Sequence, residues 1–194
     1  MDYDLKTALR PALVFTVLFA VLLGLAYPLA ITGVAQIALP DQANGSLVRD
    51  ARGQVVGSAL IGQGFVGAGY VHGRPSAAGK GYDALASAGS NLGPASAALD
   101  ERVRADVSAL QLPPGATVSA DLVTASASGL DPHVSPEAAL SQAARIAAAR
   151  GVGADRVRAV IAAAVERPLL GLIGEPRVNV LAVNRALDQA LPTR

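Results

Sequence analysis

PALVFTVLFAVLLGLAYPLAITGVAQIALP, residues Pro11–Pro40, contains no charged side chain, and this stretch decides the architecture of the chain. A helix rises about 1.5 Å per residue, so roughly 20 such residues cross the hydrocarbon core of a bilayer. The stretch is longer than that and predicts a membrane-spanning helix. A secretory signal peptide is the alternative, but its apolar region is shorter, and Gly33 and Ala35 offer only a weak cleavage site.

Small side chains recur every four residues along this span, at Thr16, Ala20, Gly24 and Pro28. Helices in lipid associate where small residues let their backbones approach, so this ridge predicts a packing surface for another membrane helix. The alternative is that the ridge reflects a chain rich in Ala and Gly. Pro28 also lacks an N–H group and leaves the Gly24 carbonyl without its helical donor, which predicts a kink there.

The span contains no Asp, Glu, Lys, Arg or His, so it offers nothing that would carry an ion across the bilayer. Basic residues near its two ends are evenly matched, with Lys6 and Arg10 before it and Arg49 and Arg52 after it. Because Arg10 directly precedes the apolar run, we expect the N-terminal side to stay inside. The predicted organisation is a cytoplasmic tail at residues 1–10, a transmembrane segment at 11–40 and an extracytoplasmic domain at 41–194.

Composition excludes several kinds of site in the domain. The chain has no cysteine, which excludes disulfides, thiolate metal sites and a cysteine nucleophile. Its two histidines, His72 and His133, are far apart in sequence, which disfavours a histidine-rich metal site. A net charge of +1 provides no long-range attraction to nucleic acid or to an anionic surface.

Hydrophobic periodicity and turn residues predict one domain that mixes strands and helices. The expected elements are a hairpin within 45–61, a glycine-rich loop at 62–83, a strand at 117–125, and helices at 95–110, 135–150, 155–168 and about 180–191. The helices at 135–150 and 155–168 should form an antiparallel pair because their connection is short. Since no βαβ unit repeats, the fold class is α+β.

Gly62, Gly64 and Gly67 match the dinucleotide-binding pattern G-x-G-x-x-G, and Asp83 follows about 20 residues later. That motif requires a helix to begin at the glycines, so that the helix N-terminus can hold the pyrophosphate. The sequence after Gly67 contains further glycines and Pro75, and it favours a tight loop instead.

Two other clusters suggest alternative functions. Ser126, Ser128, Asp131 and His133 are the residue types of a hydrolytic triad, but within eight residues they are more typical of turns and helix caps. A membrane-tethered hydrolase is therefore an alternative function.

The arginines of the predicted helix pair suggest a DNA-binding helix-turn-helix, which makes a membrane-tethered regulator the less favoured alternative. They are Arg145, Arg150, Arg156 and Arg158. Arginines on the outer faces of surface helices are ordinarily solvated.

Four stretches together resemble one family, the C subunits of the Kdp potassium-transporting ATPase (KdpC). They are GSALIGQGFVGAGYVHGRPSAAG at 57–79, YDALASAGSNLGP at 82–94, the segment 121–151 that begins DLVTASASGLDPHVSPEAAL, and LGLIGEPRVNVLAVNRALD at 170–188. The departures are mild: Ala88 and Ala127 stand where we expect other small residues such as Gly, and Val71 and His72 stand where an aromatic side chain is common.

The resemblance implies an accessory, non-catalytic subunit of a high-affinity K⁺ uptake complex in the bacterial inner membrane. The implied partners are a channel-like K⁺-translocating subunit, a P-type ATPase subunit and a small single-span subunit. The complex would use ATP, Mg²⁺ and K⁺, and this chain would bind no cofactor itself. The family is described as raising the affinity of the pump for ATP, which an outside domain could do only through long-range coupling.

The stretches that carry the resemblance also contain the candidate residues for structural support or subunit contact. These are Arg74, Asn91, Asp131, His133, Glu175, Arg177 and Asn179. They sit in turn-rich segments and lack catalytic spacing, so no catalytic residue and no metal ligand is predicted.

Overall fold

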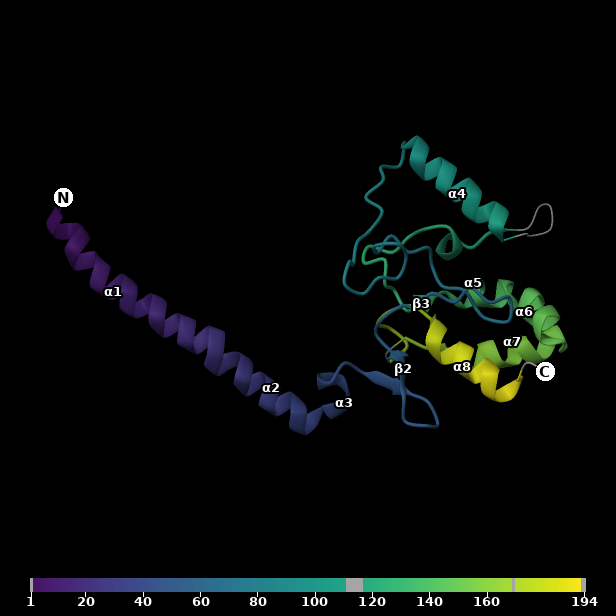
Figure 1. The fold of residues 1–194 in the computed structure, drawn as a ribbon, viewed down its shortest axis with the longest axis horizontal. Coiled ribbons are helices and arrows are strands. Elements are labelled where there is room, and N and C mark those ends of the chain that lie inside the picture. The colour runs from purple at the N-terminus through teal and green to yellow at the C-terminus, as the bar shows by residue number, and fades with distance from the viewer. Residues whose placement is uncertain (1, 111–116, 169, 193–194) are drawn as a thin grey trace. The chain divides into compact units, whose positions relative to one another are not determined.

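The structure is a computed structural model that describes residues 2–110, 117–168 and 170–192 (Figure 1). The chain forms two compact units, residues 1–47 and 48–194. Nearly all of the first unit is helix, and the second mixes short strands with helices. The predicted α+β class with one apolar N-terminal helix is confirmed.

The first unit consists of α1 (Asp2–Val21), a π-helical turn (Leu22–Ala26), α2 (Tyr27–Ala38) and the short α3 (Pro40–Ala43). Together the first three form one apolar helical stretch, Thr7–Ala38, which is long and apolar enough to cross a membrane and is not buried against the rest of the protein. No other helix of the described residues meets that criterion.

The expected irregularity near Gly24 takes the form of a wide helical turn. The π-helical turn Leu22–Ala26 contains Gly24 and ends two residues before Pro28. Pro28 has no N–H to donate to the Gly24 carbonyl, and a shift to longer-range hydrogen bonds is a common way for a helix to absorb such a gap.

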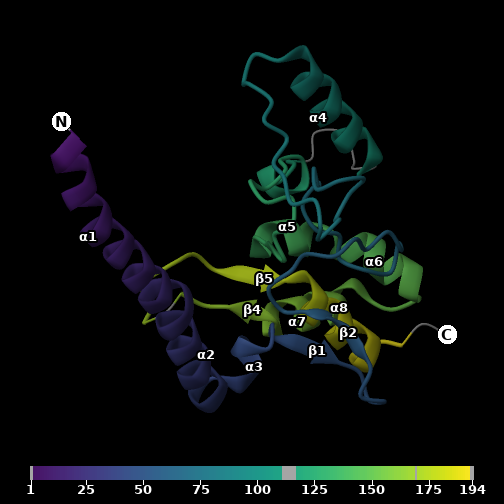
Figure 2. The same cartoon turned by 60° about the vertical axis from the view of Figure 1, so that its left-hand side comes forward.

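The second unit begins with a two-stranded sheet of β1 (Leu47–Arg49) and β2 (Val55–Ser58), as the predicted hairpin requires. A three-stranded sheet in the order β3-β5-β4 comes later, built from β3 (His133–Val134), β4 (Val165–Glu166) and β5 (Arg177–Asn179). Figure 2 shows β4 and β5 side by side. Both pairings are antiparallel, with His133 opposite Asn179 and Glu166 opposite Arg177.

The core of this unit lies between the sheet and four helices. The helices are α5 (Pro136–Ser141), α6 (Ala143–Arg150), α7 (Ala154–Ala163) and α8 (Val180–Ala190). The largest fully buried apolar side chains are Ile146, Ile161, Leu187, Val71, Val157, Val178 and Val183. α5 begins as predicted, because Ser135 Oγ accepts a hydrogen bond from the backbone N–H of Ala138 and Pro136 occupies the first turn.

Three sequence predictions of secondary structure are wrong in detail. The strand expected at 117–125 is replaced by a 3-10 turn at Ala120–Leu122, where the Thr124 hydroxyl donates to the Ala120 carbonyl at 2.7 Å. Local side-chain bonds of this kind compete with sheet pairing. The helix expected at 135–150 is interrupted at Gln142, and the one expected to reach Pro168 ends at Ala163 and passes into β4. The helix expected at 95–110 is confirmed as α4 (Ala97–Ala109).

The glycine-rich loop is irregular but closely held, because buried amide side chains bind its backbone. Asn184 Oδ1 accepts from the Val71 N–H at 2.7 Å, and Asn184 Nδ2 donates to the Val71 carbonyl at 2.9 Å. Gln142 binds both backbone groups of His72 in the same way, at 2.9 and 3.1 Å. These two side-chain amides supply the hydrogen bonds that a neighbouring strand would give to the backbone groups of Val71 and His72. An irregular segment can therefore enter the core without leaving buried backbone groups unpaired.

Two arginines of α6 complete this grip, so the expectation that they are solvated is wrong. Arg145 donates to the carbonyls of Ala68 and Tyr70 at 2.6 and 3.0 Å. Arg150, whose side chain is 0% exposed, donates to the Gly69 carbonyl at 2.7 Å, and its guanidinium carbon lies 5.1 Å from the centre of the Tyr70 ring. No helix follows Gly67 up to residue 96, so the dinucleotide-binding pattern lacks its helix.

Candidate functional site

Five of the predicted contact residues line one polar pocket of about 420 Å³ in the second unit. Its complete lining is Arg74, Asp121, Asp131, His133, Val134, Ser135, Glu175, Pro176 and Arg177. The glycine-rich loop contributes Arg74, the 3-10 turn contributes Asp121, and the other residues belong to β3, its flanks and the approach to β5. Residues far apart in sequence therefore meet on one face of the domain.

Asp131 is the centre of this pocket. Its Oδ2 accepts a hydrogen bond from Arg74 Nη1 at 3.3 Å, and its Oδ1 accepts from the backbone N–H of His133 at 2.9 Å. The His133 ring stays close, with Nδ1 3.6 Å from Oδ1. Arg74 is oriented further by Thr124, whose carbonyl and hydroxyl accept from it at 3.2 and 3.3 Å.

Gly62 explains how Asp131 reaches this position. Its N–H donates to the Leu130 carbonyl at 2.7 Å, and a Cβ at residue 62 would lie 2.6 Å from the Asp131 carbonyl oxygen. Only glycine permits so close an approach of the two backbones. The first glycine of the pattern at 62–67 thus serves packing beneath the pocket.

The other charged groups of the pocket differ in how many hydrogen bonds they make within the domain. Asp121 Oδ2 accepts from the backbone N–H of Ser135 at 2.7 Å, and Arg177 Nε donates to Glu166 at 2.9 Å across the β4–β5 pair. Glu175 is exposed at the rim of the pocket. The site therefore presents a rigid mixture of positive and negative groups, which suits recognition of a polar surface.

The geometry does not assemble a hydrolytic triad from the predicted residues. Ser126 Oγ lies 3.4 Å from Ser128 Oγ, and Ser128 Oγ accepts from the Leu130 N–H at 3.1 Å, as expected for turn chemistry. The bonds of Ser126 and Ser128 therefore run to each other and to the backbone, and the His133 ring lies against Asp131, whereas nucleophilic activation needs the serine hydroxyl to be bonded to the base. Residues 2–110, 117–168 and 170–192 contain no cluster of three His, Cys, Asp or Glu that could hold a metal ion.

Two predicted contact residues lie outside the pocket. Asn179 is only 5% exposed, and it caps α8 by accepting from the Ala182 N–H at 3.1 Å while it donates to the Ala59 carbonyl at 2.8 Å. Asn91 is exposed in the loop before α4 and has a φ of 50°, a conformation that Asn tolerates better than most residues. Asn179 therefore supports the fold, and Asn91 forms a turn.

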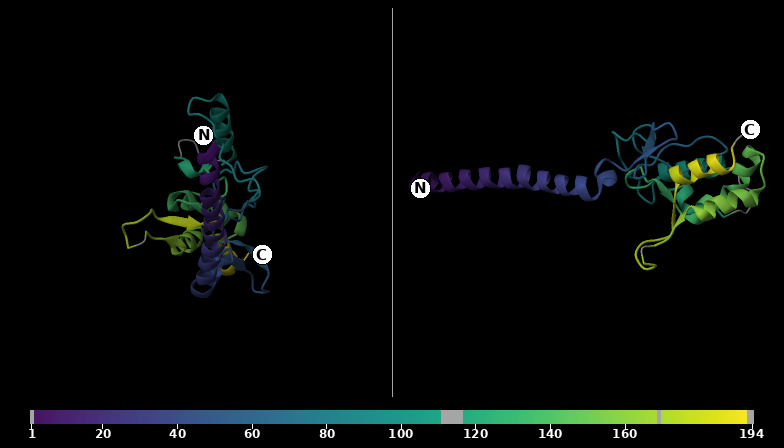
Figure 3. Two further views of the ribbon diagram at one scale, coloured as in Figure 1. Left: turned by 90° about the vertical axis from the view of Figure 1, so that its left-hand side faces the viewer. Right: turned by 90° about the horizontal axis from the view of Figure 1, so that it is seen from below.

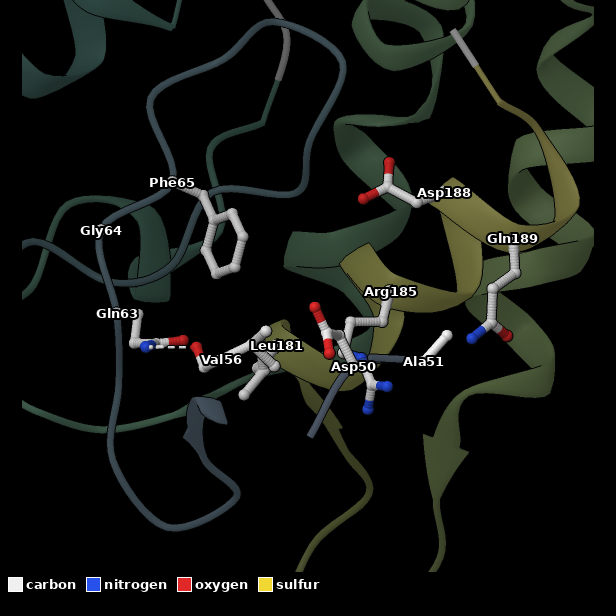
Figure 4. A pocket seen from close by; sticks show the side chains of 10 residues that line it. All are labelled: Asp50, Ala51, Val56, Gln63, Gly64, Phe65, Leu181, Arg185, Asp188 and Gln189. Atoms are coloured by element: carbon white, nitrogen blue, oxygen red, sulfur yellow. Dashed lines mark hydrogen bonds between the residues drawn. The ribbon is translucent and has the colours of Figure 1, made fainter. Parts of the chain in front are cut away.

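A second pocket, of about 490 Å³, lies between the β1–β2 hairpin, the start of the glycine-rich loop and α8 (Figure 4). Several of its polar groups hold these elements together. Gln63 Nε2 donates to the Val56 carbonyl at 3.0 Å, and Arg185 donates to the Arg49 carbonyl at 2.8 Å. Asp50 Oδ1 accepts from the N–H groups of Arg52 and Gln54, both at 2.9 Å, and so closes the hairpin turn.

Comparison with known proteins places the chain. A family model described as "KdpC: K+-transporting ATPase, c chain" matches residues 9–189. The chain belongs to the KdpC family. It is 63% identical over 185 residues to a protein from Caulobacter vibrioides named potassium-transporting ATPase KdpC subunit, covering 95% of this chain and 94% of that protein.

Further KdpC relatives extend the same agreement. Proteins of the same name from Myxococcus xanthus and Cereibacter sphaeroides are 60% and 56% identical over 186 residues, covering 94% and 96% of this chain and 86% and 99% of theirs. The family resemblance drawn from the four sequence stretches is confirmed. The match to KdpC includes nearly all of the apolar helix and every residue of the polar pocket.

Sequence reasoning missed Asp121 in the pocket and the polar side chains that hold the loop, which are the buried Gln142, Arg150 and Asn184 and the half-buried Arg145. Nothing in the local sequence marks Asp121 as a pocket residue, because it reaches Ser135, 14 positions away, only once the chain between them has folded. Gln142 and Asn184 interrupt apolar helical faces, and a polar residue on such a face is a signal that it binds a partner inside the fold.

Proposed function

We propose that this chain is an accessory, non-catalytic subunit of an ATP-driven potassium-transporting complex, in which it supports assembly and promotes ATP-coupled K⁺ uptake. The family match over residues 9–189 is the observation that carries the proposal. Two features of the chain support it. The uncharged span offers no path for an ion, and the polar groups of the pocket are held in place by hydrogen bonds and ion pairs, as befits a preorganised contact surface.

The proposed arrangement is a single span in the bacterial inner membrane. Residues 1–10 lie in the cytoplasm, 11–40 cross the bilayer, and 41–194 form the extracytoplasmic domain. The partners are the channel-like subunit, the P-type ATPase subunit and the small single-span subunit, and ATP, Mg²⁺ and K⁺ are handled by them. An effect of this chain on ATP affinity is then a coupling free energy carried through the complex.

The polar pocket is the proposed contact between the domain and a partner subunit. We expect Glu175→Lys to reduce the recovery of partner subunits with a tagged chain in mild detergent at least several-fold, because reversing a charge in a complementary interface is costly. Glu175 is exposed, so the fold should survive the change. The matched control is Glu101→Lys on exposed α4. Equal recovery for the two variants would rule the pocket out as the contact.

The orientation can be measured in intact cells, because the natural chain has no cysteine. Single cysteines at the exposed positions Ala51 and Ser108 should react with a membrane-impermeant thiol reagent before lysis. A cysteine in place of Asp4 should react only after lysis. The reverse pattern would place the domain in the cytoplasm.

A further inference from the structure

The loop between β4 and β5 presents an apolar tip to solvent. Leu170, Leu172 and Ile173 are 83%, 87% and 64% exposed. Gly171 and Gly174 punctuate them with φ values of 74° and 95°, which turn the chain sharply at the tip. Three exposed aliphatic residues within four positions call for a partner, whereas single exposed ones do not.

The base of this loop is firmly built into the domain. Val165 pairs with Val178, and Val178 is completely buried in the core. The next pair outward joins Glu166 to Arg177, whose side chains form an ion pair at 2.9 Å. The base of the loop is thus fixed to the sheet, and the tip extends from it with its described side chains exposed.

The tip lies at the end of the domain that the short connection ties to the apolar helix. Figure 2 and the right panel of Figure 3 both show the β4–β5 loop projecting from the end of the domain at which the chain enters through β1. Only residues 39–46 separate the apolar helix from β1. At about 3.5 Å per extended residue, this connection keeps the entry point within about 30 Å of the bilayer surface.

We propose that the tip of the β4–β5 loop is a second membrane contact, in which Leu170, Leu172 and Ile173 insert into the interfacial region of the bilayer. Exposed Arg167, at the base of the loop, then faces the lipid phosphates. Insertion removes the aliphatic side chains from water, and the adjoining span makes the binding intramolecular, so a weak contact suffices. The proposal goes beyond the assembly role and does not depend on it.

A bilayer suits this tip better than a protein groove does. The described tip side chains are purely aliphatic, and such side chains gain from burial at the acyl boundary without a shaped pocket to receive them. The bilayer is also the one surface that the span keeps within reach in every state of the chain. A contact with a partner subunit is the competing outcome, and the experiment separates the two.

The test places an environment-sensitive fluorophore on a single cysteine at residue 172 of the otherwise cysteine-free full chain, reconstituted alone into phosphatidylethanolamine–phosphatidylglycerol vesicles. Nitroxide-labelled lipid should quench this probe at least about threefold more strongly than the same probe at Leu85, which is 99% exposed elsewhere in the domain. Adding Leu170→Ser and Ile173→Ser should remove most of the difference, because the probe already replaces Leu172 and both remaining aliphatic side chains of the tip are then lost.

Equal quenching at residues 172 and 85 would overturn the proposal. It would also fail if the residue-172 probe became shielded only when partner subunits were co-reconstituted and remained insensitive to nitroxide lipid, since the tip would then bind protein. Residues 170, 172 and 173 are exposed, so the fold should tolerate these changes, and circular dichroism on each variant verifies that it does.

Discussion

Arg150 illustrates how one side chain can organise a segment distant in sequence. Its side chain is 0% exposed, and it donates to the carbonyls of Gly69, Leu187 and Leu191 and to Asp188 Oδ1, the last at 2.8 Å. The guanidinium suits this role because it has five donors in a fixed plane. It joins the end of α6, the end of α8 and the glycine-rich loop.

Arg150→Ala should therefore destabilise the domain by about 3 kcal/mol, because it leaves buried carbonyls without donors and removes the packing of the side chain. The measurement is chemical denaturation of the full chain in detergent. Arg158→Ala is the control: Arg158 is 52% exposed in its side chain and pairs with exposed Asp155, so its loss should cost no more than about 0.5 kcal/mol. Similar losses for both variants would contradict the assigned role.

His72, in the glycine-rich loop, should make the stability of the domain depend on pH. Burial is the main cause that lowers its pKa below 6.5, and nearby Arg145 lowers it further, while a hydrogen bond from Nε2 to the Gly67 carbonyl at 3.0 Å opposes the shift. The folded protein then keeps the ring neutral at a pH where the unfolded chain takes up a proton. Acid should favour the unfolded state at this residue.

The stability that His72 contributes should be fully present above about pH 6.5 and be lost as the pH falls through the lower folded-state pKa. His72→Gln should flatten this part of the pH profile of the unfolding midpoint. His133→Gln, which retains His72, should keep the step. A profile for His72→Gln that still falls as steeply as the natural one would assign the pH dependence to other groups.

At the scale of elements, the apolar helix combines a small-residue ridge with a wide turn. In an α-helix, residues four apart drift by about 40° around the axis, so a four-residue ridge slowly leaves its face. A π-helical turn has more residues per turn and rotates the following side chains back. The turn Leu22–Ala26 therefore helps to keep Thr16 and Ala20 in line with Pro28.

Gly24→Leu should lower the yield of assembled complex per inserted chain, because a large side chain on the ridge holds a neighbouring helix away. Within the chain the change is harmless, since a Cβ at residue 24 would meet nothing within 4 Å. Leu22→Ala, also in the wide turn, is the control and should matter less. Growth at K⁺ concentrations that require the pump, together with complex yield in detergent, gives the comparison. Equal results for both variants would show that the ridge reflects composition only.

The whole molecule joins two units whose stability has different sources: the domain has an apolar core of its own, and the apolar helix depends on a lipid or detergent environment. Residues 48–194 have a core of buried aliphatic side chains, whereas the side chains described for residues 7–47 are almost all exposed. In lipid or detergent, a helix keeps its backbone hydrogen bonds because no water is there to replace them. The two units should therefore unfold independently.

Heating the full chain in detergent should unfold the domain cooperatively and leave the helical signal of about 32 residues, Thr7–Ala38, at the end of the transition. Circular dichroism at 222 nm follows both. If the signal fell to that of a random coil in one transition, the apolar helix would depend on the domain for its structure.

The sequence by itself determined the features that depend on local chemistry. The uncharged run predicted the long apolar helix, Pro28 located the irregular turn, Ser135 and Pro136 located the start of α5, and four stretches were sufficient to recognise the family. These signals are legible because helix length, proline and capping act over a few neighbouring residues.

Only the tertiary structure decided which polar residues are buried and what they bind. The polar pocket unites Arg74, Asp131 and Glu175, and the candidates were named individually with no indication that they meet. The sequence predicts that Arg150 is a surface arginine, but in the structure α8 and the glycine-rich loop enclose its side chain. The reason is physical: a polar side chain can be buried wherever the fold supplies hydrogen-bond partners, and those partners can lie more than a hundred positions away, 113 between Val71 and Asn184 and 120 between Ala59 and Asn179.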